Sequence, residues 1–274
     1  MRVFVLGTGS AEGLPALFCE CAVCREAHQR RGKDLRTRAS VLIDDTVKID
    51  LPPDTLAHVH AYPQIRLSAL EHLLFTHSHD DHFAARELQY LSPNFAPGRK
   101  APLRLWAAEP LLRRLPAETA GFFERPPLEI CPLEPFREYA VGHLTVTPVE
   151  ANHKEDELSL NYLLRDAAGR TLLYATDTGW YAPRTWEFLR GVLVHAVIAE
   201  CGRGISDNPY CGHLNFDEAV CFRQELLAGG GLAPDAPFYL THICHTGLLL
   251  HDEFTARAAP HGIQVAFDGL TFDV

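Results

Sequence analysis

The sequence predicts a β-rich α/β protein built as two comparable halves. Three observations predict this class. Short apolar runs of strand type recur along the chain, amphipathic stretches with helical spacing stand between them, and in each half a strand runs into metal-type residues. The 274 residues are 47% hydrophobic, and no Ser/Gly linker or charge block divides them. We therefore expect a single domain over residues 1–274.

The elements of the first half can be taken in order. Residues 3–6 have the composition of a buried strand. Residues 38–45 and 47–51 are expected to form the two strands of a hairpin. Residues 72–77 form another apolar strand, which leads into a histidine cluster. Residues 80–91 then have helical spacing, because apolar side chains recur on one side.

The second half repeats this style. Two strands are expected within 159–177, around an Asp-Ala-Ala-Gly turn, and a helix is expected over 216–228. The remaining expected elements are strands at 143–151, 192–201 and 237–243, a helix at 184–191, and a closing hairpin at 263–274.

Charge and hydropathy exclude several classes of function. The net charge of −10 opposes stable nucleic-acid binding, because most of the surface repels phosphate. Residues 25–38 are a basic exception, either a solvated face or a patch that attracts a phosphate-bearing substrate. The apolar runs are too short for a membrane span or a secretory signal. We expect a cytoplasmic protein, in which thiols stay reduced and clustered cysteines indicate a metal.

The strongest chemical signal is THSHDDH at residues 76–82. His77 and His79 share one face of an extended chain, because side chains alternate there. A turn into the next segment then brings Asp81 and His82 to a neighbouring position, so that two residues serve one ion and two another. Imidazole and carboxylate groups suit zinc, manganese or iron(II).

The pattern H-x-H-x-D-H after an apolar strand resembles the signature of the metallo-β-lactamase fold, an αββα sandwich of two mixed sheets flanked by helices. Asn152-His153 resembles the third histidine of that family, Asp177 in YATDTG the bridging aspartate, and His242 in YLTHICH the final histidine. The resemblance implies one metal held by His77, His79 and His153, a second held by Asp81, His82 and His242, and Asp177 bridging both. Two divalent metals, zinc or manganese with iron also open, would then share a hydroxide.

Residues 18–24 read FCECAVC, with Cys19, Cys21 and Cys24 close together. The stretch 7–24 resembles the start of the PhnP-type phosphodiesterases that accompany the bacterial carbon–phosphorus lyase, relatives of tRNase Z. In that family three cysteines and a histidine hold a structural zinc, and His245 stands at the matching place. Cys3His is also a recognised structural zinc set. Cys244 is the competing ligand; otherwise it is a buried free thiol.

The resemblance implies a metal-dependent hydrolase that acts on a small cyclic or nucleotide-derived phosphodiester. Asp81 counts among its catalytic residues, and His213, in the loop 202–219, would protonate the leaving alkoxide. A histidine at the start of a helix, with Asn215 as the cap, is the alternative for His213.

Two other functions stay open. One is hydrolysis of a thioester or lactone. The other is a biosynthetic role like that of the coenzyme PQQ synthesis protein B group, which shares the early cysteines and a stretch like RASVLID but lacks a complete H-x-H-x-D-H. The complete motif in this chain favours hydrolysis. A homodimer also stays open.

Overall fold

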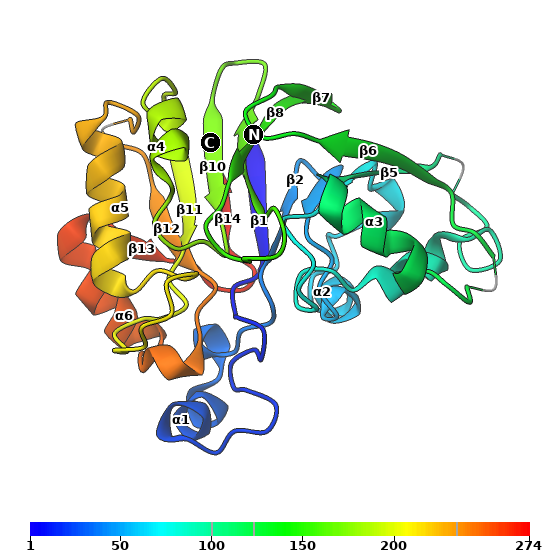
Figure 1. Ribbon diagram of the computed structural model, residues 1–274. Coiled ribbons are helices and arrows are strands. Elements are labelled where there is room, and N and C mark those ends of the chain that lie inside the picture. Colours follow the sequence, from blue (N-terminus) through cyan, green and yellow to red (C-terminus); the bar gives the residue numbers. More distant parts are fainter. Residues whose placement is uncertain (100, 123, 234) are drawn as a thin grey trace.

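The structure is a computed structural model that describes residues 1–99, 101–122, 124–233 and 235–274. Within these ranges the chain forms two seven-stranded mixed β-sheets. The sheets pack face to face, and helices cover the outer face of each (Figure 1). The αββα sandwich predicted from the sequence is therefore confirmed.

The first sheet has the strand order β14-β1-β2-β3-β4-β5-β6. Neighbours from β14 to β3 are antiparallel, and those from β3 to β6 are parallel. Its strands are β1 (Arg2–Gly7), β2 (Ser40–Ile43), β3 (Val47–Ile49), β4 (His72–Leu74), β5 (Leu103–Ala108), β6 (Leu128–Leu133) and β14 (Thr271–Asp273).

The second sheet has the order β13-β12-β11-β10-β9-β8-β7. Neighbours from β7 to β10 are antiparallel, and those from β10 to β13 are parallel. Its strands are β7 (Tyr139–Val141), β8 (Leu144–Glu150), β9 (Leu160–Arg165), β10 (Thr171–Ala175), β11 (Ala196–Glu200), β12 (Phe238–Thr241) and β13 (Gln264–Val265).

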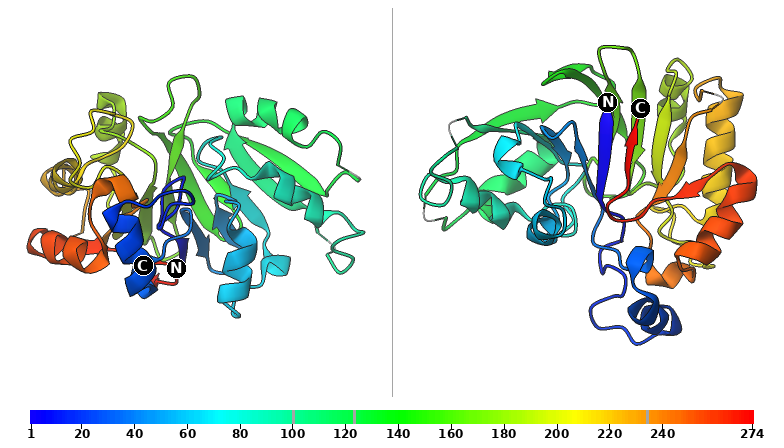
Figure 2. Two further views of the ribbon diagram at one scale, coloured as in Figure 1. Left: turned by 90° about the horizontal axis from the view of Figure 1, so that it is seen from below. Right: turned by 180° about the vertical axis from the view of Figure 1, so that it is seen from behind.

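The helices lie on the outer faces, except for one that projects from the body. Helices α2 (Thr55–Ala61) and α3 (Glu109–Glu118) cover the first sheet, and α4 (Pro183–Leu189), α5 (Phe216–Ala228) and α6 (His251–Ala258) cover the second (Figures 1 and 2). Helix α1 (Ala22–Arg30) stands apart at the bottom of Figure 1, in an arm that carries the cysteine-rich stretch. No helix among the described residues combines the length and the apolar character needed to cross a membrane.

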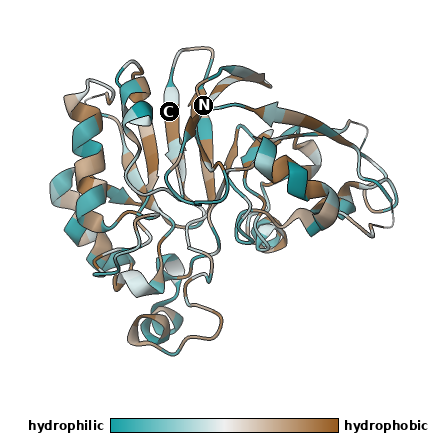
Figure 3. Ribbon diagram, in the orientation of Figure 1, coloured by the Kyte–Doolittle hydropathy of each residue, from teal (hydrophilic) through white to brown (hydrophobic). Residues whose placement is uncertain are grey.

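Side-chain alternation explains how the layers pack. In β1, Val3 and Val5 point into the core between the sheets, whereas Phe4 and Leu6 point to the helices outside. The strands of the second sheet alternate in the same way. Apolar residues therefore fill both sides of each sheet, and the central strands in Figure 3 are largely apolar.

Helix α5 has the bounds that its sequence predicts. Its N-terminus carries a capping box, in which the Asn215 side chain accepts from the Glu218 amide at 2.8 Å and the Glu218 carboxylate accepts from the Asn215 amide at 2.8 Å. The box fixes where the helix begins, and the periodic apolar face fixes how far it runs.

Two expected elements differ in the structure. Residues 80–91 do not form one helix, because the chain turns after the histidine motif and becomes a 3-10 helix only over Ala85–Leu91. The closing stretch 263–274 is not a hairpin: β13 pairs with β12 in one sheet, and β14 pairs with β1 in the other. Two short strands joined by a turn look alike in sequence in both cases, and only the position of the two sheets decides which partner each strand takes.

Candidate metal centres and active site

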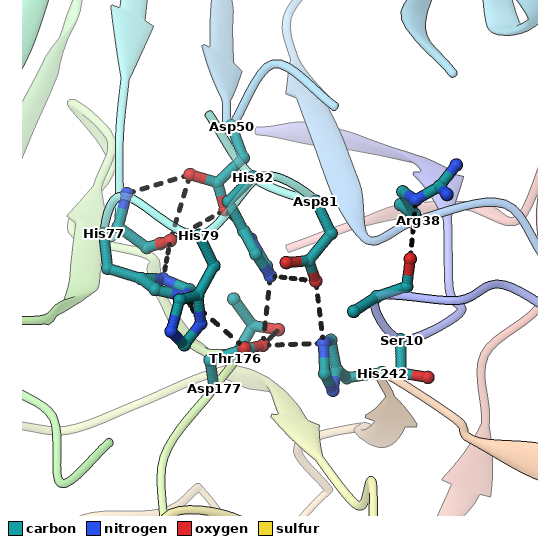
Figure 4. Close-up of polar contacts among 12 residues, drawn as sticks. Ser10, Arg38, Asp50, His77, His79, Asp81, His82, Thr176, Asp177 and His242 are labelled. Atoms are coloured by element: carbon teal, nitrogen blue, oxygen red, sulfur yellow. Dashed lines mark hydrogen bonds and ion pairs between the residues drawn. The ribbon is translucent and has the colours of Figure 1, made fainter. Parts of the chain in front are cut away.

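Polar donor groups gather where strands of both sheets end. Asp50 follows β3, and the motif at 76–82 follows β4 in the first sheet. In the second sheet, His153 follows β8, Asp177 follows β10 and His242 follows β12. Figure 4 shows side chains that follow β3, β4, β10 and β12 pointing toward one another, among them Asp50, His82, Asp177 and His242. The two sheets therefore each contribute about half of one polar cluster at their shared edge.

The first group of donors comprises His77, His79, His153 and Asp177. The His79 Nδ1 atom lies 2.9 Å from His77 Nε2 and 3.0 Å from His153 Nε2. The Asp177 Oδ2 atom lies 3.6 Å from His77 Nε2 and 3.4 Å from His153 Nε2. Three imidazole nitrogens and one carboxylate oxygen thus converge, as tetrahedral coordination of a single cation requires.

The second group comprises Asp81, His82, Asp177 and His242. Here Asp177 uses its other oxygen: Oδ1 lies 3.3 Å from His82 Nε2 and 3.0 Å from His242 Nε2. The Asp81 Oδ2 atom lies 3.0 Å from His82 Nε2 and 3.5 Å from His242 Nε2. One carboxylate therefore serves both groups.

Three buried histidine nitrogens of the second group lack hydrogen-bond partners among the described residues. His82 Nε2 and both nitrogens of His242 make no hydrogen bond among the described residues, although carboxylate oxygens lie close to them. A buried polar atom without a hydrogen-bond partner lowers the free energy of unfolding of a protein. Lone pairs that converge on one point, rather than along N–H···O lines, fit a cation held between them. The donor set therefore fits the divalent metals that the sequence implies.

The electrostatics of the cluster point the same way. Burial and the neighbouring His82 hold the pKa of His77 well below its usual range. Burial also opposes a charge on His242, yet the carboxylates of Asp177 and Asp81 raise the pKa of that imidazole to about 10. The pKa of Asp177 lies well below normal because His242 and His82 outweigh its burial. The carboxylates thus demand positive charge, which a divalent cation supplies when the histidines are neutral.

Three residues of this cluster have strained backbones. Asp50, Asp177 and His242 have φ angles of 62°, 52° and 56°, in the left-handed region that favours glycine. Each follows the end of a strand, where the chain must bend sharply to bring a side chain back over the sheet edge. Such strain is a recurrent property of functional sites.

Further contacts fix the orientation of the imidazoles. The Asp50 Oδ2 atom accepts from His82 Nδ1 at 2.7 Å, and the carbonyl oxygen of Gly212 accepts from His153 Nδ1 at 2.9 Å. Each contact leaves the Nε2 atom of that histidine free to face the cluster. Partners of this kind set the tautomer of a metal-binding histidine and raise its basicity.

His213 lies beside both donor groups. Its ring stacks on His242, with centroids 5.1 Å apart, and lies 4.7 Å from the ring of His153. Its Nδ1 atom is 3.1 Å from Oε1 of Glu200, a fully buried residue at the end of β11. Burial opposes a charge on His213, but Glu200 raises its pKa. The same histidine lies two residues before Asn215, the N-cap of α5, so its position is compatible both with a site role and with a place at the start of a helix.

The three cysteines and His245 form a third group. The His245 Nδ1 atom lies 3.4 Å from Cys19 Sγ and 3.5 Å from Cys21 Sγ. Backbone amides point at the sulfurs: Ala16 N lies 3.4 Å from Cys24 Sγ. Burial opposes ionisation of Cys21, but the Cys24 amide, His245 and Cys19 lower its pKa to about 6. The stretch and the distant histidine are therefore brought together as expected.

Cys244 belongs to a different group. It is buried, and its sulfur lies 2.9 Å from both Glu12 Oε1 and Thr246 Oγ1. It falls outside the group formed by the three cysteines and His245. The geometry therefore favours His245 over Cys244 as the partner of the cysteines.

A cavity of about 250 Å³, lined mostly by residues with polar side chains, opens onto the donor groups. Its walls come from the loop after β1, the loop 202–214 and the segment after β12, and include Ser10, Glu12, Arg203, Tyr210 and Thr246. A larger cavity of about 770 Å³ lies on the outer face of the first sheet, near α2, and is lined by no residue of the three donor groups. The chemistry therefore belongs to the smaller cavity.

Comparison with known proteins agrees with this geometry. Residues 41–243 match the family described as the beta-lactamase superfamily domain. The chain belongs to the beta-lactamase superfamily. The match spans His77 to His242, so it contains both histidine and aspartate groups. The protein thus has the fold of the hydrolase members of the superfamily.

Solved structures of superfamily members resemble the whole chain. A diphosphatase from the PhnP family is 26% identical, with a TM-score of 0.78, over 100% of this chain and 97% of that one. Zn²⁺-bound PqqB from Methylobacterium extorquens is 19% identical, with a TM-score of 0.77, over 100% of both chains. The short form of human tRNase Z is 14% identical, with a TM-score of 0.69, over 100% and 99%. The last two likenesses demonstrate the fold alone.

A curated relative has a different name. An octanoyltransferase from Porphyromonas gingivalis is 27% identical over 164 residues, which are 56% of this chain and 31% of that protein. The chain therefore spans about a third of the length of this relative.

Sequence reasoning missed Asp50, Glu200 and Glu12. Asp50 directly follows β3, and Glu200 ends β11, so an acid at the end of an apolar strand was the available signal. No signal of that kind marked Glu12, which lies in a loop.

Proposed function

We propose that the protein is a metal-dependent phosphodiester hydrolase with two active-site metals. The observation that carries this proposal is the position of Asp177. Its two oxygens face two different groups of donors, at 3.4 Å from His153 on one side and 3.0 Å from His242 on the other. Two adjacent divalent cations activate water at neutral pH and neutralise the anionic oxygens of a phosphodiester. Zinc, manganese and iron suit these donors.

The chain's own residues would complete the chemistry. Asp81, His82 and His242 would hold one cation, and His77, His79 and His153 the other. Glu200 would keep His213 protonated through its contact with Nδ1. His213 could then donate a proton from Nε2 to the leaving oxygen.

The size of the cavity and the net charge of the protein favour a small substrate. A volume of about 250 Å³ lies below the usual range of ligand pockets, which begins near 300 Å³. The net charge of −10 opposes capture of a long nucleic acid. A cyclic ribose phosphate or a nucleotide-derived diester fits both constraints. The likeness to a diphosphatase of the PhnP family at 26% identity also favours phosphate chemistry.

We also propose a structural zinc held by Cys19, Cys21, Cys24 and His245. A closed set of three thiolates and one imidazole leaves no position for substrate. Metal analysis should give about three metals per chain, and Cys19→Ser should give two and a less stable protein. Two metals in the parent protein, with Cys19→Ser folding normally, would remove this site.

Acyl chemistry is the second candidate, because the octanoyltransferase matches over 164 residues. A substrate panel separates the two candidates. Strong turnover of bis(p-nitrophenyl) phosphate, with none of thioesters or lactones, supports phosphodiester hydrolysis, and the reverse pattern overturns it. A protein with full metal occupancy that turns over no ester would instead fit a biosynthetic role. Asp177→Asn should abolish turnover, whereas Asp252→Asn, an exposed acid outside the cluster, should preserve it.

A further inference from the structure

Glu12 lies between the cavity and the cysteine group. Its loop connects β1 to α1, and the residue lines the cavity that opens onto the active-site donors. Its Oε1 atom lies 3.2 Å from His245 Nε2 and 2.9 Å from Cys244 Sγ, and its Oε2 atom accepts from Ser10 Oγ at 2.9 Å. One carboxylate therefore contacts a residue of the cysteine group and residues of the cavity wall.

Backbone hydrogen bonds hold this loop against the segment after β12. The Ile243 amide donates to the Thr8 carbonyl at 2.8 Å, and the Ser10 amide donates to the Ile243 carbonyl at 3.2 Å. Gly9 and Ile243 form a parallel bridge. The position of Glu12 relative to His245 is thus fixed by the main chain as well as by its own side-chain contacts.

The contact between Glu12 and His245 determines which ring nitrogen of His245 is available to a metal. His245 faces the cysteine sulfurs with Nδ1, so Nε2 is the nitrogen that must carry the proton. The Glu12 carboxylate lies at that nitrogen. A carboxylate in this position selects the tautomer, holds the ring plane and increases the electron density on the nitrogen that binds the metal.

We propose that Glu12 is a positioning residue for the zinc held by the three cysteines and His245. This inference rests on the proposed structural zinc and is independent of the proposed phosphodiester substrate. Since the same loop lines the cavity, Glu12 would also tie the projecting arm to the wall of the active site.

Glu12→Gln tests the proposal, because it keeps the size of the side chain and removes the charge. Glu20→Gln is the matched control: it makes the same change between two of the cysteines, in an exposed side chain without a contact to His245. Zinc transfer to a chromogenic chelator measures the affinity. In cobalt-substituted protein, the thiolate-to-metal charge-transfer band reports on the cysteine site, since the active-site donors include no thiolate.

We expect Glu12→Gln to weaken zinc binding at the cysteine site by about 10- to 100-fold and to alter the cobalt band. Glu20→Gln should match the parent protein in both measurements. Zinc affinity and a cobalt band equal to those of the parent would overturn the proposal. These readouts involve no substrate, so failure of the phosphodiester assay leaves the result unaffected.

Cys244→Ala separates Glu12 from its other neighbour. The change removes the thiol that contacts Glu12 but keeps the carboxylate beside His245. Zinc binding close to that of the parent is expected. A loss as large as that of Glu12→Gln would overturn the proposal, because it would mean that Glu12 acts through Cys244. If Glu12→Gln fails to fold, Glu12→Asp replaces it, because it keeps the charge but shortens the reach of the side chain. Its zinc affinity should be lower than that of the parent. A parent-like zinc affinity would count against the proposal.

Discussion

Replacing Asp50 with asparagine should weaken binding of one active-site metal. Asp50 is fully buried, its Oδ1 accepts from the Thr76 amide at 2.8 Å, and its Oδ2 accepts from His82 Nδ1 at 2.7 Å. In Asp50→Asn, the amide oxygen keeps the bond from Thr76, so the NH2 group faces His82. His82 must then accept at Nδ1, which moves its proton to Nε2, the nitrogen aimed at the metal. Flipping the amide instead points its NH2 group at the Thr76 amide and loses that hydrogen bond.

The expected loss follows from this single inverted contact. Removing the partner of a metal-binding histidine typically costs about 10- to 100-fold in metal affinity, or about 1.4–2.7 kcal/mol. Titration of apoprotein with manganese or zinc against a competing chelator measures it. Asp45→Asn is the matched control, because it makes the same change in the hairpin that leads into Asp50, at an exposed side chain paired with Arg2. Equal metal affinity in Asp50→Asn and the parent would refute the tautomer argument.

The remaining predictions concern the leaving group, a close backbone contact and a buried charge. His213→Ala should lower kcat by about 10²–10⁴-fold on diesters with poor leaving groups and far less on nitrophenyl esters. On the poor leaving groups, Glu200→Gln should give a kcat between those of the parent and His213→Ala. Equal losses of kcat across leaving groups would exclude proton donation by His213. Gly179→Ala should lower kcat, because its Cβ would lie 1.7 Å from the Cys211 carbonyl oxygen and displace the loop that ends at His213, whereas Gly98→Ala, which meets nothing within 4 Å, should not. Burial lowers the pKa of Lys48 to about 7, so between about pH 7 and 10 the folded state binds fewer protons than the unfolded state and becomes more stable as pH rises. In denaturant unfolding, the free energy of unfolding of Lys48→Met should therefore exceed that of the parent most at pH 7, and the excess should shrink toward pH 10. An excess that is constant with pH would contradict this reasoning.

Short-range sequence patterns predicted the position of several helices and strands and part of the candidate site. Helix α5 begins where its capping box places it, and the strands that carry Asp177 and His242 end close to the expected residues. The motif at 76–82 marked four members of the two donor groups within six residues, whereas His153, Asp177 and His242 were expected from the family resemblance. Such features are encoded over a few positions and survive any choice of tertiary partner.

The rest depends on contacts between distant segments. Asp50 and Glu200 are single acids whose meaning appears only when β3 and β11 bring them to His82 and His213. The local sequence of residues 263–274 is compatible both with a hairpin and with two strands in different sheets. Neither periodicity nor turn chemistry contains the information that decides these cases.

The donor groups are divided between the two sheets, so a metal bound there would hold the two halves of the molecule together. One half supplies the motif after β4, the other supplies His153 and His242, and the Asp177 carboxylate faces both. Any ion that binds across this seam favours the docked sheets over separated ones. Two fragments divided between β6 and β7, each carrying one sheet's donors, would then associate more tightly with metal than without it. Metal-dependent association of the fragments would therefore report on binding at the shared donor groups.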